Sequence, residues 1–181
     1  MIKSNEVLVP MDEKKHDKEI IFQNLIKKYP DLIPGDQINS ENPRRWLFVG
    51  EEVYFPTLEG GGLKLDLLFL DQNGIPTLVE LKKANNPDLK KDVVAQILEY
   101  GANILLSMDY RDIRERVEAN NDISVSEYLD KEEIDEEKFW EEVHNNLKAE
   151  KMRLLVIEED IPYKLQNIIE FINRNMNSVR S

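Results

Sequence analysis

Four side chains between positions 66 and 96 could together carry out metal-assisted chemistry on a phosphate. Asp66 and Glu80 are carboxylates, Lys82 is an amine two residues after Glu80, and Gln96 is an amide in the segment that follows. Two carboxylates can hold a divalent cation such as Mg²⁺, which prefers oxygen ligands and keeps several waters. A cation there polarises a phosphoryl oxygen and activates a water, and a neighbouring lysine can neutralise developing charge.

The positions of these residues on strands decide whether they can meet. Glu80 and Lys82 project from the same face of a strand, because side chains alternate, while Val79 and Leu81 point into the core. Asp66 lies on the preceding apolar run, which a short turn joins to the run of Glu80. We therefore expect Asp66 to reach the same edge of the sheet. Two carboxylates there repel each other unless a cation lies between them.

A surface role accounts for part of the same pattern. An Asp followed by a Glu-x-Lys occurs by chance in charged sequences, and Glu80 with Lys82 could form a solvated ion pair of little energy. Against this interpretation, the two charges interrupt an otherwise apolar strand, where charges without partners are costly.

The apolar periodicity predicts the elements that position the four residues. Asn73-Gly74 between two apolar runs is typical of a hairpin, and Asn86-Pro87 is typical of a helix start. Residues 45–56 form two strands, or one strand with a bulge. The expected helices are 17–29, 86–105, 109–119, 135–148 and 162–175, with a short helix inside 121–134; the expected strands are 45–49, 52–56, 63–70, 76–82 and a buried one at 152–158. A long helix can return the chain as a parallel strand, which gives an α/β sandwich with a mixed central sheet.

Some residues outside the four have a structural and a functional interpretation. The first helix carries an apolar stripe, which comprises Ile20, Ile21, Phe22, Leu25, Ile26 and Tyr29. Trp46 and Trp140 are expected in the core. Four basic residues could contact backbone phosphates or be solvated at the surface, and these are Arg44, Arg45, Lys90 and Lys91.

Composition sets the class of protein. The chain has 181 residues and 41% hydrophobic content, enough for one core, and no apolar run reaches the length that spans a bilayer. It has no cysteine, so disulfides and thiolate metal sites are excluded. We expect a soluble, cytoplasmic protein without a membrane partner.

The net charge of −12 is unusual for a protein that binds nucleic acid, but residues 112–150 hold 14 acidic and 5 basic side chains, so the acidity is localised.

These residues resemble the motifs of the PD-(D/E)XK nuclease superfamily, in a little-characterised bacterial and archaeal branch. Asp66 matches the first metal-binding Asp, and Glu80-Leu81-Lys82 matches the (D/E)-x-K element. Gln96 matches a helix glutamine found in several branches, and Glu19 matches an acidic residue on the first helix. Leu65 stands where the family name has proline. The resemblance covers residues 17–106 and 152–158.

The resemblance implies a restriction-endonuclease-like three-layer α/β core, with a mixed central β-sheet flanked by helices. One domain would span 1–181, with its core at 17–106 and 152–175 and an acidic helical insert at 107–150. The implied activity is phosphodiester hydrolysis in nucleic acid, with DNA expected, in the presence of Mg²⁺ or Mn²⁺. Asp66, Glu80 and Glu19 would bind the metal, and Lys82 and Gln96 would complete the catalytic set.

Alternatives to an active nuclease stay open at this point. Glu19 could simply favour the dipole of its helix, because it lies in the first turn. A nuclease fold without turnover could bind nucleic acid or protein, and the acidic net charge motivates that interpretation. Mimicry of nucleic acid is a third interpretation, which the localised charge disfavours. A homodimer is also left open.

Overall fold

The computed structural model of the chain describes residues 2–4, 7–9, 18–56, 60–82, 90–129, 134–158, 161 and 163–176. The side chains of residues 2–4, 7–9, 18, 19, 90–92, 105, 106 and 176 lie outside this description. The strands are β1 (Ile2–Ser4), β2 (Val7–Val9), β3 (Trp46–Pro56), β4 (Gly62–Asp71), β5 (Pro76–Lys82) and β6 (Arg153–Glu158). The helices are α1 (Lys18–Lys28), the 3-10 turn η1 (Pro30–Leu32), α2 (Gly35–Ile38), α3 (Lys90–Ser107), α4 (Tyr110–Asn120), α5 (Val125–Leu129), α6 (Glu136–Lys148) and α7 (Tyr163–Met176).

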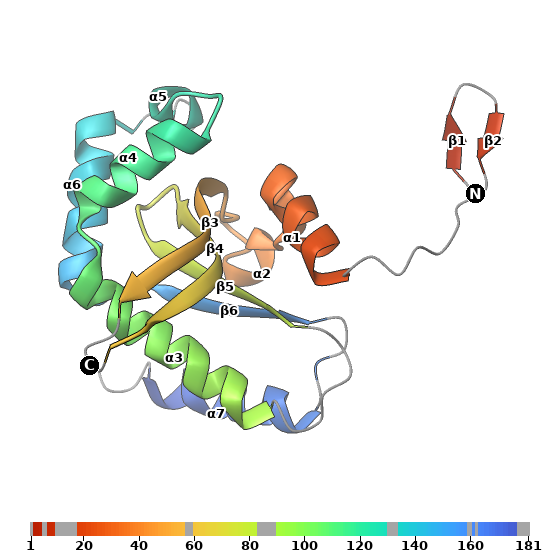
Figure 1. The fold of residues 1–181 in the computed structure, drawn as a ribbon. Helices are drawn as coiled ribbons and strands as arrows, with labels where there is room; N and C mark the ends of the chain where they lie inside the picture. The colour runs from red at the N-terminus through yellow and green to blue at the C-terminus, as the bar shows by residue number, and fades with distance from the viewer. Residues whose placement is uncertain are drawn as a thin grey trace.

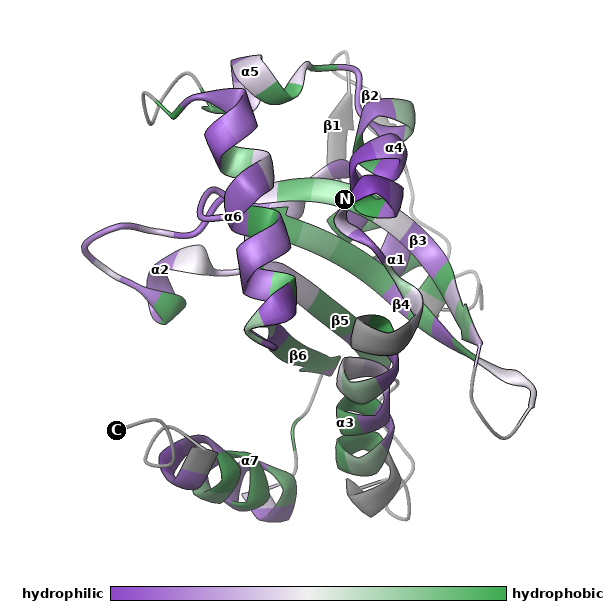
Figure 2. Ribbon diagram, turned by 90° about the vertical axis from the view of Figure 1, so that its left-hand side faces the viewer, coloured by the Kyte–Doolittle hydropathy of each residue, from purple (hydrophilic) through white to green (hydrophobic). Residues whose placement is uncertain are grey.

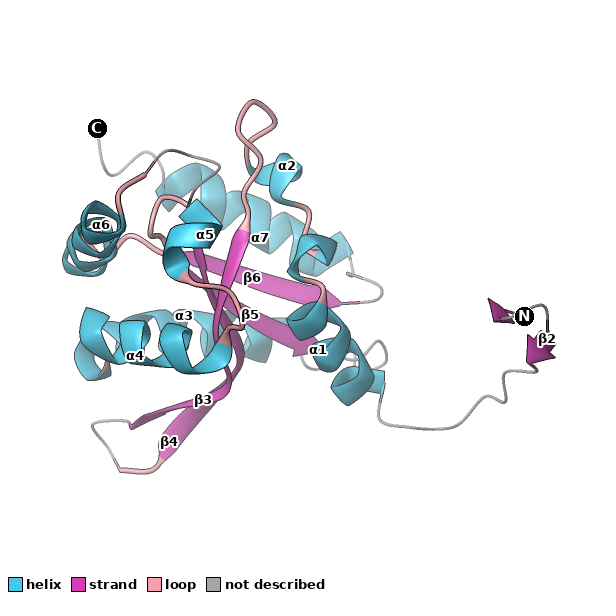
Figure 3. Cartoon of the chain, turned by 90° about the horizontal axis from the view of Figure 1, so that it is seen from above, coloured by secondary structure: helices cyan, strands magenta, loops and turns pink. Residues whose placement is uncertain are grey.

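The central sheet is four-stranded and mixed, in the order β3-β4-β5-β6 (Figure 1). β3 pairs antiparallel with β4, and β4 pairs antiparallel with β5. β6 returns parallel to β5, with the register running from Thr77 opposite Arg153 to Lys82 opposite Glu158. The mixed sheet and the parallel return predicted from the sequence are therefore confirmed. β1 and β2 form a separate hairpin that stands apart in Figures 1 and 3.

The turn between β4 and β5 is built by one buried carboxylate. Asp71 Oδ1 accepts hydrogen bonds from the backbone N–H groups of Asn73 and Ile75, both at 2.9 Å. Gly74 has φ +68°, a backbone conformation that residues with a Cβ rarely adopt. The other carboxylate oxygen of Asp71 lies 2.7 Å from Arg153 Nη1, so the turn is tied to the first residue of β6. The Asn-Gly signal predicted this hairpin correctly.

Buried side chains form one cluster on each face of the sheet, which gives three layers (Figure 3). On one face the strands pack against α3, α4, α5 and α6, through residues that include Tyr100, Ile113 and Phe139. On the other face Ile26 of α1 and Ile33 after η1 pack against Phe69, Val79 and their neighbours. Trp46 and Trp140 are buried, as predicted. The architecture is therefore a mixed α/β fold with helices on both faces of the sheet.

The acidic segment folds as helices with defined ends. The Asp109 side chain caps α4 in a capping box, and Asp135 caps α6 by accepting bonds from the N–H groups of Glu137 and Lys138. Phe139 and three further apolar or aromatic residues of α6 are buried, while most of the visible surface of α6 in Figure 2 is hydrophilic (purple). The predicted acidic, amphipathic helix is confirmed.

Several sequence expectations need correction or completion. Residues 46–56 form one strand with an irregularity between Phe48 and Gly50, which is the bulged alternative. β6 was expected to be buried, but all six of its residues are only half-buried. Of the apolar stripe on α1, only Ile26 is buried. The short elements β1, β2, η1 and α2 were not predicted, and the expected helix start at Asn86-Pro87 lies outside the described residues. None of the described helices is long and apolar enough to cross a membrane.

Candidate metal and phosphodiester site

The carboxylate of Asp66 lies where β4 and β5 stop pairing. The pairing of the two strands ends with Leu67 opposite Val79, and Asp66 is the residue of β4 immediately before Leu67. Its Oδ2 accepts a 2.7 Å hydrogen bond from the backbone N–H of Leu81. The side chain therefore replaces the missing ladder bond, and it is held against the segment of β5 that carries the other site residues.

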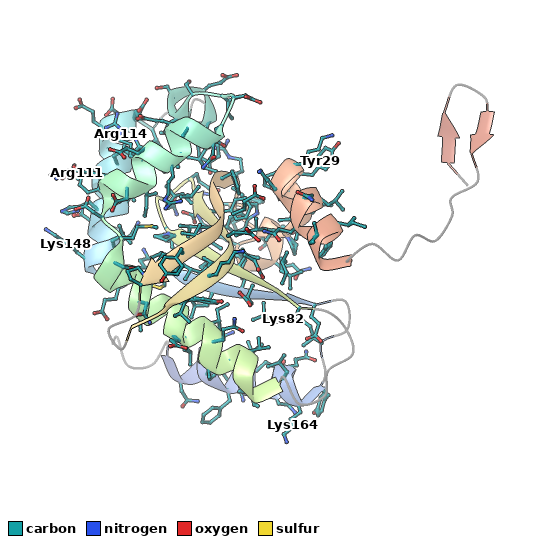
Figure 4. The ribbon with its side chains drawn as sticks, in the orientation of Figure 1. Tyr29, Lys82, Arg111, Arg114, Lys148 and Lys164 are labelled. Carbon is teal, nitrogen blue, oxygen red and sulfur yellow. The ribbon has the colours of Figure 1, made fainter. Side chains whose placement is uncertain are left out.

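Glu80 and Lys82 lie on either side of Leu81 and contact each other. Lys82 Nζ lies 2.5 Å from Glu80 Oε1. Glu80 is only 2% exposed, whereas Lys82 is partly open at the end of β5 (Figure 4). The buried charge of Glu80 is thus compensated by an amine that itself reaches solvent. The Asp66 carboxylate accepts from the N–H of Leu81, which lies between Glu80 and Lys82 in the chain. Two carboxylates and one lysine therefore lie close together near the end of β5.

Gln96 reaches the same region through a tyrosine that sequence reasoning did not single out. Gln96 Nε2 donates to Tyr100 Oη at 2.7 Å, and the Tyr100 hydroxyl donates to the backbone oxygen of Lys64 at 2.7 Å. This chain of bonds joins α3 to β4 two residues before Asp66. The Gln96 amide, which was expected in the catalytic set, thus contacts Tyr100 in the described structure. Gln96 and Tyr100 are four residues apart in α3, so their side chains lie on one face of the helix, and this spacing was the sequence signal for their contact.

The pKa of Tyr100 reports the charges around it. Burial, and then the negative charge of Glu80, raise the pKa of Tyr100 to about 12, with a smaller contribution from Asp66. The hydrogen bond from Gln96 acts in the opposite direction. Both carboxylates therefore lie close enough to this hydroxyl to act on it. The phenol stays protonated at neutral pH and serves as a donor to the backbone of β4.

α1 is fixed to the same strand by a second polar contact. Gln23 Nε2 donates to the backbone oxygen of Asp66 at 3.2 Å. Glu19 lies one turn before Gln23 in α1, but its side chain is outside the described part of the chain. Among the side chains that are described, no group of three or more carboxylates or histidines gathers. Of the three metal ligands expected from the sequence, Asp66 and Glu80 are the two whose side chains the structure describes, and Mg²⁺ is commonly held by one or two carboxylates with waters and substrate oxygens.

Backbone irregularities on β3 lie beside Asp66. The register passes from Glu51 opposite Leu67 to Val53 opposite Leu65, so Glu52 is the residue across from Asp66. Glu52 has φ 50°, which is a strained conformation for a residue with a Cβ. Bulges and left-handed residues often re-aim side chains next to functional sites. A bulge in this segment was one of the two alternatives expected from the sequence, but the left-handed conformation of Glu52 was not expected.

The arginines that could have contacted phosphates face the interior instead. Arg44 Nε lies 3.8 Å from the buried Asp71, and its side chain is 11% exposed. Arg45 Nη1 donates to the backbone oxygen of Tyr128 at 3.0 Å, and its guanidinium lies over that tyrosine ring. Neither of the two roles considered from the sequence, solvation or phosphate contact, describes them. The side chains of Lys90 and Lys91 lie outside the described residues.

A hollow of about 500 Å³ opens elsewhere, between β3 and the helices α3 and α4. It is lined by Tyr54, Arg116, Asn120 and their neighbours, and by none of the site residues predicted from the sequence. Comparisons with family models, with curated proteins and with solved structures gave no match for this chain. A functional interpretation therefore has to come from the site itself.

Proposed function

We propose that this chain is a metal-dependent nuclease of the PD-(D/E)XK type, with a restriction-endonuclease-like fold, that hydrolyses phosphodiester bonds in nucleic acid, with DNA as the expected substrate. One observation supports this proposal above the others. The Asp66 carboxylate binds the N–H of Leu81, and the two residues flanking Leu81 are Glu80 and Lys82. The two carboxylates that would bind the metal and the lysine that would neutralise charge on the phosphate are therefore adjacent.

The residues have distinct roles in this proposal. Asp66 and Glu80 hold Mg²⁺ or Mn²⁺, with Glu19 as a further ligand from α1. When bound, the metal supplies Lewis acidity toward a phosphoryl oxygen and lowers the pKa of its water. Lys82 moves from Glu80 to the phosphate, where its charge offsets the charge that develops during reaction. Gln96 acts with Tyr100 to hold α3 against β4, so that the ligand pair keeps its separation.

The experiment compares isosteric variants with matched surface controls. Asp66→Asn keeps an oxygen that accepts from the N–H of Leu81, so we expect folding to be preserved and Mg²⁺-dependent cleavage to be lost. The double variant Glu80→Gln with Lys82→Met removes the buried pair without leaving one charge alone. The exposed changes Asp36→Asn and Lys138→Ala should cleave as wild type does. Activity is measured on single-stranded, duplex and branched DNA and on RNA, and metal affinity is measured by calorimetry. Wild-type activity in Asp66→Asn would refute the proposal.

A second candidate is a nuclease fold that binds nucleic acid or protein without turnover. The burial of Glu80 and its contact with Lys82 favour it, because the described arrangement closes part of the site with the protein's own lysine. This candidate predicts binding of one of the four nucleic acids with no cleavage in either Mg²⁺ or Mn²⁺. It also predicts that Asp66→Asn leaves binding unchanged.

A further inference from the structure

A row of apolar side chains on α1 and the turn after it faces solvent. We call this row the α1 strip, and it comprises Ile21 (51% exposed), Phe22 (39%), Leu25 (42%), Tyr29 (51%) and Leu32 (53%). Phe22 and Leu25 are three residues apart in α1, so they lie on one side of the helix, while Tyr29 and Leu32 extend the strip through the 3-10 turn η1. Figure 4 shows Tyr29 at the outer end of α1, away from the sheet. The Lys28 amine lies 5.3 Å from the centre of the Tyr29 ring, so a positive charge borders the strip at this end.

The opposite side of α1 is fixed to the sheet, so the strip cannot turn inward. Ile26 is 1% exposed in the cluster with Phe48 and Phe69. Lys27 forms an ion pair with Glu51 of β3, and Gln23 is bonded to the backbone of Asp66. Rotating α1 to bury the strip would break all three contacts. The exposure of the strip is therefore part of the folded structure.

The size of the strip suits an interface. Single exposed apolar residues are common on proteins, whereas the largest apolar patch of a protein, on the order of 300–600 Å², is often a functional surface. Five large side chains exposed by two-fifths to one half present on the order of 500 Å². A standard protein–protein interface takes about 800 Å² from each partner. The strip supplies most of that area, and the polar residues at its edge can supply the rest.

A second copy of the same chain can occupy the strip without bringing the acidic segments together, because α1 packs on the face of the sheet opposite to the acidic helices α4 and α6. Two molecules of net charge −12 repel each other most strongly through the segment 112–150. The sequence of α1, KEIIFQNLIKK, has three lysines and one glutamate, so this helix is not acidic. A two-fold axis that passes through the strip perpendicular to α1 sets the two α1 helices antiparallel, with the opposite ends of their dipoles side by side. We propose that the chain forms a symmetric homodimer in which the α1 strips of two copies pack against each other, with Leu25 near the axis.

The first test changes the strip and a matched site elsewhere. Leu25→Glu introduces a charge at the centre of the strip, and Ile123→Glu introduces the same charge at an apolar residue of similar exposure (46%) between α4 and α5. Sedimentation velocity from 1 to 200 µM should give a dimer for wild type and Ile123→Glu and a monomer for Leu25→Glu. Circular dichroism should give the same secondary structure for all three proteins, whereas thermal unfolding of wild type and Ile123→Glu, but not of Leu25→Glu, should shift upward with protein concentration. A monomeric wild type, or a dimeric Leu25→Glu, would overturn the proposal.

The second test uses the absence of cysteine from the chain. A single Leu25→Cys variant places two thiols near the proposed axis. Oxidation of these thiols by a disulfide oxidant such as oxidised glutathione should yield a covalent dimer in high proportion at low protein concentration. Ile123→Cys should yield little. Equal cross-linking of the two variants would place the contact elsewhere and refute the pairing of α1. Neither test depends on nuclease activity, so each outcome is independent of the proposed function.

Discussion

Replacement of Tyr100 by phenylalanine tests how the candidate site is held together. The Tyr100 hydroxyl accepts from Gln96 and donates to the backbone oxygen of Lys64, and the residue is 2% exposed. Phenylalanine keeps the ring and loses both bonds. At a net contribution of about 1 kcal/mol for each bond, the free energy of unfolding should fall by about 2 kcal/mol at pH 7.

The same variant should respond differently to alkaline pH. An unfolded tyrosine ionises near pH 10, whereas the pKa of Tyr100 in the folded chain is about 12. The unfolded state therefore loses this proton first, and the stability contributed by Tyr100 is complete below pH 10 and declines as pH rises toward 12. At pH 11 wild type should lose about 1.4 kcal/mol through this residue, relative to pH 7. The difference between wild type and Tyr100→Phe should then shrink to less than 1 kcal/mol.

Urea unfolding of both proteins at pH 7, 9, 10 and 11 measures this difference directly. The other five tyrosines of the chain cancel, because they are common to both proteins. Tyr163→Phe serves as a control, since Tyr163 is 77% exposed and its change should stay within about 0.5 kcal/mol. A difference that stays constant from pH 7 to 11, or a loss below about 0.5 kcal/mol at pH 7, would refute the inferred hydrogen bonding and charge environment.

Two further predictions concern stability outside the site, and both can be measured by urea unfolding. Glu150 follows the last turn of α6 and has φ 55°, so Glu150→Gly should raise the free energy of unfolding by about 1 kcal/mol. Glu141→Gly, within the helix, should lower the free energy of unfolding by a similar amount. A destabilised Glu150→Gly variant would contradict the left-handed conformation of Glu150. Asp71→Asn keeps the turn acceptor but leaves the half-buried charges of Arg44 and Arg153 without their anion, so a loss of about 3 kcal/mol is expected. A loss below about 1 kcal/mol would show that solvent already compensates these arginines.

The sequence predicted best those features that depend on local patterns. Asn73-Gly74 specified the turn between β4 and β5, because a left-handed glycine has few alternatives there. The alternation around Glu80 predicted that Glu80 and Lys82 share a face, and their side chains do contact each other. The helices of the acidic segment were predicted from capping residues and apolar spacing.

Features that depend on distant partners were not predictable in the same way. The bond from Tyr100 to Lys64 joins residues 36 positions apart, so no local pattern indicates it. The apolar stripe of α1 has the spacing of a core-facing helix, yet only Ile26 is buried, because the polar contacts of Gln23 and Lys27 select the face that meets the sheet. Arg44 resembled a surface cation because nothing local shows that Asp71 is buried beside it.

The half-buried state of β6 has a consequence for the behaviour of the protein at high concentration. β6 is apolar along four consecutive residues, 154–157, and within the described part of the chain only β5 pairs with it (Figure 2). An uncovered apolar edge can recruit strands from unfolded chains and so seed aggregates. The strand has only six residues, and Arg153 and Glu158 place a charge at each end of it. Charges that flank an unavoidable hydrophobic segment can act as gatekeepers against aggregation, and Arg153 and Glu158 flank the apolar residues of this edge strand.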